Sequence, residues 1–242
     1  MLREALRKAA AGEPLSEGEA ERALETIMEG GASPEATAAL LTALRVRGES
    51  VQEIVGFARA MRRFAARVRA PEGVVDTCGT GGDAKGTINV STAAAFVARG
   101  AGVVIAKHGN RAATSRAGSA DVLEALGAAI ELSPEQVSRC IEEAGIGFMF
   151  ARTHHPAMRH VAPVRAELPF RTVFNLLGPL TNPAGARRQL VGVFSAGYVR
   201  PMAEALEGLG AERALVVHGR DGMDEITVTG PTLVAEVGGG GV

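Results

Sequence analysis

The sequence predicts an α/β protein with a small amino-terminal helical domain and a larger α/β domain built on a mainly parallel sheet. Residues 1–70 contain only helical patterns, in which apolar residues recur three and four positions apart. From residue 71 onward, short apolar runs alternate with helices. Such alternation is typical of a parallel sheet that carries helices on both faces. We therefore expect a helical domain of 1–70 and an α/β domain of 71–242.

Capping residues mark the helix starts of the first domain. Ser16 with Glu19 and Ser50 with Glu53 have the spacing of capping boxes. Ser33 precedes a proline, which is favoured at the first helical position. Helices are therefore predicted to begin after these three serines and to pack through their apolar stripes.

The second domain is predicted from its apolar runs and from Ser133, which caps a helix through Ala144. Strands are expected from Val74 to about Cys78 and at 103–106, 146–150, 190–194 and 214–217, with a short one around Ile130. Further helices are expected at 93–99 and 199–209.

A glycine-rich loop, Gly79–Asp83, follows the first of these strands. Glycines let backbone N–H groups approach a ligand that a Cβ atom would block. Asn89 is placed to cap the next helix, so that unpaired N–H groups lie beside the hydroxyls of Ser91 and Thr92. A helix start of this kind is a binding site for an anion.

The second loop, Lys107–Arg111, adds positive charge through Lys107 and Arg111. The order Lys85-Gly86-Thr87 fails the mononucleotide P-loop motif, which needs Gly-Lys-Ser/Thr. A dinucleotide fingerprint requires an acidic residue where this chain has Lys107. A phosphorylated ligand other than these nucleotides is the simplest interpretation.

Composition excludes several classes of protein. A net charge of −1 gives no basic excess for nucleic acid, and no apolar run is long enough to cross a bilayer. Two cysteines, Cys78 and Cys140, do not make a disulfide framework, so a reduced cytoplasmic setting is expected. The spacing of His154, His155 and His160 gives no helical pair of zinc ligands.

Four motifs and their order make the interpretation specific. The motifs are Gly79–Asp83 with Thr87–Thr92, Lys107–Arg111 with Gly118–Asp121, Arg171–Pro183, and Gly222–Glu225. In this order they resemble the anthranilate phosphoribosyltransferase family of tryptophan biosynthesis. The resemblance implies transfer of a phosphoribosyl group from phosphoribosyl pyrophosphate to the amine of anthranilate, with Mg2+, in a homodimer. It also implies that 165–188 returns to the helical domain and that the α/β domain is truncated at its C-terminus, because family members continue further.

The resemblance assigns residues to the two substrates and the metal. The positions that match contacts to phosphoribosyl pyrophosphate are Gly79, Gly82, Asp83, Thr87, Asn89, Val90, Ser91, Thr92, Lys107, Ser115 and Ser119. The positions that match anthranilate contacts are Gly79, Asn110 and Arg165. The guanidinium of Arg165 suits the anthranilate carboxylate because the two groups can bond in one plane. His108 is expected to orient the amine. Asp224 and Glu225, with Ser91, supply hard oxygen ligands for Mg2+. The catalytic residues are thus predicted to be His108 and Arg165.

Two alternatives stay open. A pyrimidine nucleoside phosphorylase shares the architecture, but that family carries Val-Gly-Asp-Lys after the glycines and lacks the Lys107–Arg111 motif. A non-catalytic phosphoribosyl-binding regulator is the other. The run Ala113–Ala117 also departs from the family, which is richer in serine there and has lysine in place of Arg116.

Overall fold

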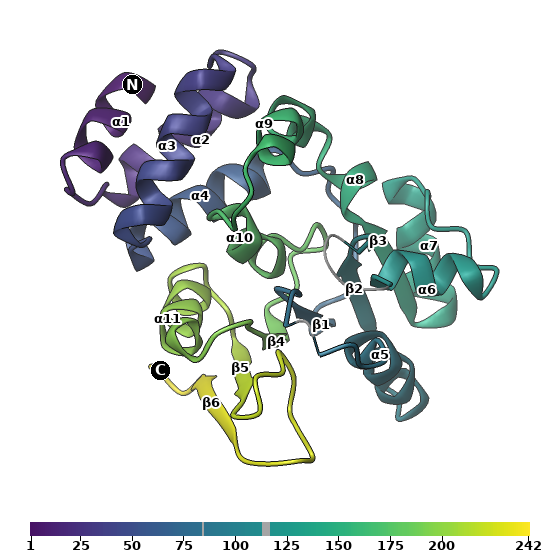
Figure 1. Ribbon diagram of the computed structural model, residues 1–242. Coiled ribbons are helices and arrows are strands. Elements are labelled where there is room, and N and C mark those ends of the chain that lie inside the picture. The colour runs from purple at the N-terminus through teal and green to yellow at the C-terminus, as the bar shows by residue number, and fades with distance from the viewer. Residues whose placement is uncertain (84, 113–116) are drawn as a thin grey trace. The chain divides into compact units, whose positions relative to one another are not determined.

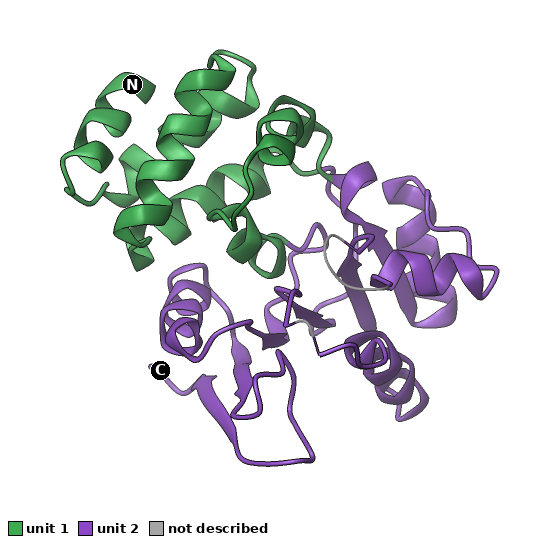
Figure 2. Ribbon diagram, in the orientation of Figure 1, with its two compact units in different colours: residues 1–65, 155–181 green, residues 66–154, 182–242 purple. Residues whose placement is uncertain are grey.

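The computed structural model describes residues 1–83, 85–112 and 117–242, and these residues divide into two compact units (Figure 2). Unit 1 contains Met1–Ala65 and His155–Thr181, and unit 2 contains Ala66–His154 and Asn182–Val242. The first boundary thus lies at 65, where the sequence suggested 70. The segment that returns to the helical unit is 155–181, where the sequence suggested 165–188.

Unit 1 is helical (Figure 1). Its α-helices are α1 (Leu2–Ala10), α2 (Glu17–Met28), α3 (Pro34–Arg47), α4 (Val51–Phe64), α9 (Ala162–Glu167) and α10 (Phe174–Leu180), with a 3-10 helix η1 (Pro156–His160). The predicted caps are confirmed: Ser16 and Ser50 form capping boxes, and Ser33 accepts a hydrogen bond from Ala36 N at 3.2 Å. Local sequence therefore sets where α2, α3 and α4 begin.

Two features hold the helices of unit 1 together. Gly56 lets α4 approach α2 closely, because a Cβ atom there would lie 2.2 Å from the carbonyl oxygen of Glu17. Glu53 is fully buried, and its carboxylate accepts hydrogen bonds from Leu15 N and Ser50 N, each at 2.8 Å. The same carboxylate forms an ion pair with Arg47. The buried charge is thus fully partnered, as buried carboxylates in stable proteins are.

Unit 2 is built on a six-stranded sheet of order β3-β2-β1-β4-β5-β6 (Figure 1). Its strands are β1 (Val75–Gly79), β2 (Ile105–Gly109), β3 (Ile146–Phe150), β4 (Arg188–Gly192), β5 (Arg213–Gly219) and β6 (Thr232–Val237). Its helices are α5 (Val90–Gly100), α6 (Ser119–Ala125), α7 (Pro134–Ala144), α8 (Ala151–His154), the 3-10 helix η2 (Ala196–Tyr198) and α11 (Val199–Gly208). β6 is antiparallel to β5 and the other pairs are parallel, so the predicted fold class is confirmed.

Side chains alternate between the two faces of the sheet, as strand geometry requires. On one face Ala106 and Met149 pack with Val137 and Ile141 of α7. On the other, Phe150 packs with α6. Helices therefore cover both faces, and none of the described helices combines the length and apolarity needed to cross a membrane.

Several predicted boundaries were wrong. β2 extends through Gly109, so that Lys107–Gly109 belong to a strand and not to a loop, whereas β1 ends at Gly79, one residue past its predicted end. Ile130 lies in no strand, although it is buried beside α6. The strands predicted at 190–194 and 214–217 are Arg188–Gly192 and Arg213–Gly219. The helix of Val199–Gly208 and the strand of Ile146–Phe150 are confirmed.

Candidate functional site

The glycine loop after β1 lies against the segment that carries Asp224. Gly81 N donates a hydrogen bond of 2.8 Å to Asp224 Oδ2. A Cβ atom on Gly79 would lie 2.9 Å from the same oxygen, so a larger residue at this position would require the carboxylate to shift. Gly81 and Gly82 both have positive φ, of 68° and 79°. Glycine at positions 81 and 82 thus allows backbone angles that other residues rarely adopt. Glycine at position 79 allows the Asp224 carboxylate to approach closely.

The turn after β5 carries Asp224 and is itself stabilised by Asp221. Asp221 accepts hydrogen bonds from Thr227 Oγ1 at 2.5 Å and Met223 N at 3.1 Å, which keep its pKa at about 2. Asp224 is 9% exposed, whereas its neighbour Glu225 is partly buried. The turn therefore holds two adjacent carboxylates at the edge of the sheet.

Three carboxylates crowd together there. Burial, followed by the nearby charge of Asp83, raises the pKa of Asp224. Burial and the Asp224 charge raise the pKa of Glu225 to about 7, while the charge of Lys107 and a hydrogen bond from Ser91 N act in the opposite direction. Carboxylates at close range disfavour one another's ionisation unless a cation binds between them. The cluster thus brings the predicted metal residues Ser91, Asp224 and Glu225 to one place, with Asp83 beside them.

The start of α5 forms the other side of this cluster. Asn89 is the N-cap, as predicted, and its Oδ1 accepts hydrogen bonds from Thr92 N at 3.2 Å and Thr92 Oγ1 at 2.6 Å. Ser91 N donates to Glu225. Two N–H groups of this helix start, those of Ser91 and Thr92, thus already have partners within the chain.

Lys107 is buried, at 3% exposed, and reaches the same place from β2. Its Nζ donates hydrogen bonds to Thr77 O at 2.5 Å and to Ser91 Oγ at 3.1 Å. Burial lowers the pKa of its ammonium, while the charge of Asp76 acts in the opposite direction. Lys107 thus places a positive charge between β1 and the start of α5, beside the acidic cluster.

Other predicted residues lie along the ends of β1 and β2. His108 and Ser119 are buried, whereas Asn110 is exposed, and Ser119 Oγ donates to Asn110 O at 3.3 Å. Arg111 was expected to add positive charge, but its charge is paired within the chain. Its guanidinium pairs with Asp121 at 2.9 Å and Glu124 at 2.7 Å.

The remaining predicted residues lie at several places along the chain. Thr87 is exposed in the loop before α5, while Gly82 and Val90 are partly buried. Ser115 lies outside the described residues. Arg165 belongs to unit 1, where its guanidinium carbon lies 5.3 Å from the centre of the Phe174 ring. Burial lowers the pKa of Arg165.

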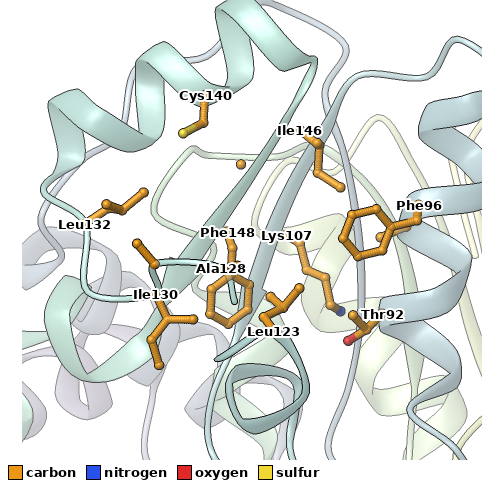
Figure 3. A pocket seen from close by; sticks show the side chains of 13 residues that line it. Thr92, Phe96, Lys107, Leu123, Ala128, Ile130, Leu132, Cys140, Ile146 and Phe148 are labelled. Atoms are coloured by element: carbon orange, nitrogen blue, oxygen red, sulfur yellow. The ribbon is translucent and has the colours of Figure 1, made fainter. Parts of the chain in front are cut away.

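A cavity of about 160 Å³ opens between α5, β2, β3 and α6 (Figure 3). Its walls are mainly apolar, with Phe96 and Phe148 on opposite sides, and the Lys107 side chain points along it toward Thr92. Ligand pockets for small molecules usually measure about 300–1,000 Å³. This cavity is therefore small and apolar compared with the polar edge of the sheet.

The donor chemistry at that edge suits Mg2+. Within the described ranges, no three His, Cys, Asp or Glu side chains form a ready-made metal site. Mg2+, however, is commonly held by one or two carboxylates and completes its shell with water and substrate phosphates. Two adjacent carboxylates with raised pKa values fit that pattern, because a divalent cation would relieve their repulsion.

Two family models match the chain along almost all of its length. Residues 3–65 match the helical bundle domain of a glycosyl transferase family, and residues 71–242 match the a/b domain of a glycosyl transferase family. An anthranilate phosphoribosyltransferase of Bradyrhizobium sp. strain BTAi1 is 59% identical over 97% of this chain and 69% of its own length. One of Rhodospirillum rubrum is 62% identical over 96% of this chain and 67% of its own length. The chain belongs to the anthranilate phosphoribosyltransferase family.

Solved structures of this family share the fold. The anthranilate phosphoribosyltransferase of Thermus thermophilus superposes with a TM-score of 0.92 at 59% identity, over 98% of this chain and 71% of its own. The Saccharomyces cerevisiae enzyme in complex with phosphoribosyl pyrophosphate and Mg gives 0.89 at 32% identity, over 96% of this chain and 69% of its own. Both domains of the anthranilate phosphoribosyltransferase architecture are thus represented, and the chain is a pentosyltransferase of that family.

Sequence reasoning missed three residues of the site. Gly192 lies beside the Asp224 backbone, Asp76 is fully buried beneath the edge, and Asn182 donates to Asp76 Oδ2 at 2.8 Å. An aspartate inside an apolar strand was the available signal, because a carboxylate is rarely buried without a role or a partner. The partners themselves are distant in sequence and could not be read from it.

Proposed function

We propose that this chain transfers the phosphoribosyl group of phosphoribosyl pyrophosphate to anthranilate at the carboxyl edge of β1, β2 and β5. This is the reaction of the family to which the chain belongs, and it gives N-(5-phosphoribosyl)anthranilate and pyrophosphate. The observation that carries the assignment of the site is the meeting of the glycine loop, the start of α5 and the Asp224–Glu225 pair. In open α/β sheets, ligands bind at this edge.

The reaction requires stabilisation of charge more than a nucleophilic side chain. The amine nitrogen of anthranilate forms a bond to C1 of the ribose while the bond from C1 to the pyrophosphate oxygen breaks. Negative charge then grows on the leaving pyrophosphate, so fixed positive charge and donors beside it lower the barrier. Lys107 supplies a buried ammonium, and Ser91 and the glycine loop supply hydroxyl and backbone groups. We assign Gly79, Gly82, Asp83, Thr87, Asn89–Thr92, Lys107, Ser115 and Ser119 to this substrate.

Mg2+ is proposed as the cofactor. Asp224 and Glu225, with Ser91, would hold it, since hard oxygen ligands suit this ion and its charge would offset that of the pyrophosphate. The crowding that raises the pKa of both carboxylates supports this assignment. The yeast relative was solved with phosphoribosyl pyrophosphate and Mg bound, which agrees with it.

Anthranilate is assigned to Gly79, Asn110 and Arg165, with His108 orienting the amine. A planar guanidinium binds a carboxylate through two parallel hydrogen bonds, which a lysine could not reproduce. Arg165 is partly buried, which would strengthen such a pair. The yeast relative was solved in complex with 4-fluoroanthranilate, which supports this assignment.

We also propose that the protein is a cytoplasmic homodimer, as the family resemblance implies. Light scattering at micromolar concentration distinguishes a dimer from the 24.9 kDa monomer. The pyrimidine nucleoside phosphorylase and the non-catalytic regulator find no support among these similar proteins, which carry the transferase name.

The deciding experiment is turnover. Loss of anthranilate fluorescence on addition of phosphoribosyl pyrophosphate and Mg2+ is expected, and so is an equal amount of released pyrophosphate. A chain that cleaves uridine with phosphate, or that binds the sugar diphosphate without consuming anthranilate, would overturn the proposal. The Asp224→Asn, Glu225→Gln variant is the matched control for contaminating enzyme.

A further inference from the structure

Strands β1 and β2 part from one another just below the proposed site. Among the described residues, β1 is paired with β2 at Val75 and Ile105 alone. By contrast, β1 pairs with β4, and β2 with β3, over five consecutive residues each. The ends of β1 and β2 that carry the glycine loop and Lys107 are therefore not held together by a continuous backbone ladder.

Side chains take the place of that ladder. Asp76 Oδ1 accepts a hydrogen bond from His108 N at 3.1 Å. Asn182 Nδ2 donates to Ala106 O and to Asp76 Oδ2, each at 2.8 Å. On the opposite face, Lys107 Nζ donates to Thr77 O at 2.5 Å. Backbone groups that would otherwise pair β1 with β2 are thus satisfied by Asp76, Asn182 and Lys107.

Burial makes this arrangement specific. Asp76 is 0% exposed and Asn182 is 5% exposed, so neither can exchange its partners for water. Removing one partner from a buried polar network leaves the other groups unsatisfied. Asn182 is itself fixed, because its Oδ1 accepts from Ala184 N at 2.9 Å. The segment around Asn182 and Pro183 has no proposed substrate contact, but it helps to fix the spacing of β1 and β2 through Asn182.

We infer that Asp76 and Asn182 are positioning residues that hold β1 and β2 apart and thereby place Lys107 for the pyrophosphate of the substrate. This inference rests on the proposed function. Neither residue is assigned to a substrate; both act through the backbone of β2 at Ala106 and His108, the two neighbours of Lys107. Binding of phosphoribosyl pyrophosphate should depend on them more strongly than binding of anthranilate does.

The test compares Asp76→Asn and Asn182→Ala with Ser138→Ala. Ser138 is also buried in unit 2, where its hydroxyl donates to Pro134 O at 2.8 Å and accepts from Arg69 N at 3.0 Å, away from β1 and β2. We expect the first two variants to raise the KM for phosphoribosyl pyrophosphate about tenfold, with a smaller change for anthranilate. Ser138→Ala should lose thermal stability without changing the ratio of the two KM values.

Hydrogen exchange of the ligand-free protein supplies a readout that does not depend on turnover. Amides of 105–109 should exchange faster in Asp76→Asn and Asn182→Ala than in the wild type or in Ser138→Ala. Equal changes of both KM values, or unchanged exchange in 105–109, would overturn the inference. If Asn182→Ala does not fold, Asn182→Ser, which retains one hydrogen-bond donor, takes its place in both measurements. A wild-type chain without turnover would contradict the proposed function, while the exchange experiment would still decide the positioning role.

Discussion

The backbone oxygen of Asp224 lies 1.6 Å from the position that a Cβ atom on Gly192 would occupy. The end of β4 therefore accepts the acidic segment only because residue 192 has no side chain. Since the obstructing atom belongs to the backbone, a larger residue must displace the whole segment and not merely rotate a side chain.

Gly192→Ala should consequently move Asp224 and impair Mg2+ activation. We expect a loss of about 1–3 kcal/mol in the free energy of unfolding, which is the usual cost of overpacking. We also expect a higher Mg2+ concentration for half-maximal activity. Gly100→Ala is the control, because a Cβ atom there has no neighbour within 4 Å. A Gly192→Ala enzyme with wild-type Mg2+ dependence would contradict the proposed placement of Asp224.

Asp224→Asn combined with Glu225→Gln should slow turnover and weaken the Mg2+ requirement. Both changes remove negative charge while keeping side-chain size, so the loss reports on metal binding and not on packing. Steady-state rates over a titration of Mg2+ measure the effect. Glu236→Gln removes the same charge from β6, where the exposed carboxylate pairs with the surface residue Arg213, and should change nothing. An unchanged Mg2+ titration in the double variant would show that Asp224 and Glu225 do not bind the metal.

The pKa of about 7 at Glu225 predicts a stability change in the metal-free protein. An unfolded glutamate has a pKa near the ordinary value of 4.5, so between 4.5 and about 7 the folded state binds more protons than the unfolded state. Glu225 therefore contributes stability below pH 4.5, and that contribution is lost as pH rises through about 7.

Melting temperatures in EDTA from about pH 4 to about pH 8 test this for the wild type and Glu225→Gln. The wild type should lose stability relative to the variant across the window. The comparison cancels other titrating groups, including His154, whose pKa burial lowers. Parallel curves for the two proteins would show that Glu225 ionises normally.

Arg165→Ala should raise the KM for anthranilate more than that for phosphoribosyl pyrophosphate, because a carboxylate partner would be lost from one substrate only. Arg165→Lys, which keeps the charge but not the planar fork, should recover only part of the affinity. Arg159→Ala, an exposed arginine of the same unit, is the control. Equal increases in both KM values would show that Arg165 is assigned wrongly.

Glu53→Ala should destabilise unit 1 by about 3 kcal/mol, since it removes the carboxylate partner of Arg47 in a buried ion pair and leaves two backbone amides without their acceptor. Thermal unfolding measures the loss. Glu4→Ala, which breaks the exposed pair with Arg7, should have little effect. Similar melting temperatures for the two variants would exclude Glu53 as a buried anchor of the helices.

Sequence patterns predicted what depends on neighbours in the chain. The caps at Ser16, Ser33 and Ser50 are correct because each bond spans only three residues. The end of β2 was misplaced because Lys107 is polar and therefore looked like a loop residue, and the burial of Asp76 within β1 was not predicted. Both are buried inside strands, where each is stabilised by partners distant in sequence, which no local pattern reveals.

The candidate site divides in the same way. The glycine loop and the Asp224–Glu225 pair were visible as motifs, and the structure joins them through Gly81 and Ser91. Arg111 was misjudged because Asp121 and Glu124, ten and thirteen residues later, neutralise its charge after the loop folds back. Contacts that form only after the chain folds were thus the missing information in each case.

Diffraction from crystals grown with phosphoribosyl pyrophosphate and Mn2+, which replaces Mg2+ and scatters anomalously, tests the central claim most directly. We predict sugar diphosphate density beside Gly79–Thr92 and an anomalous peak in contact with the carboxylates of Asp224 and Glu225. Density at any other part of the protein, or an anomalous peak away from that pair, would contradict the account.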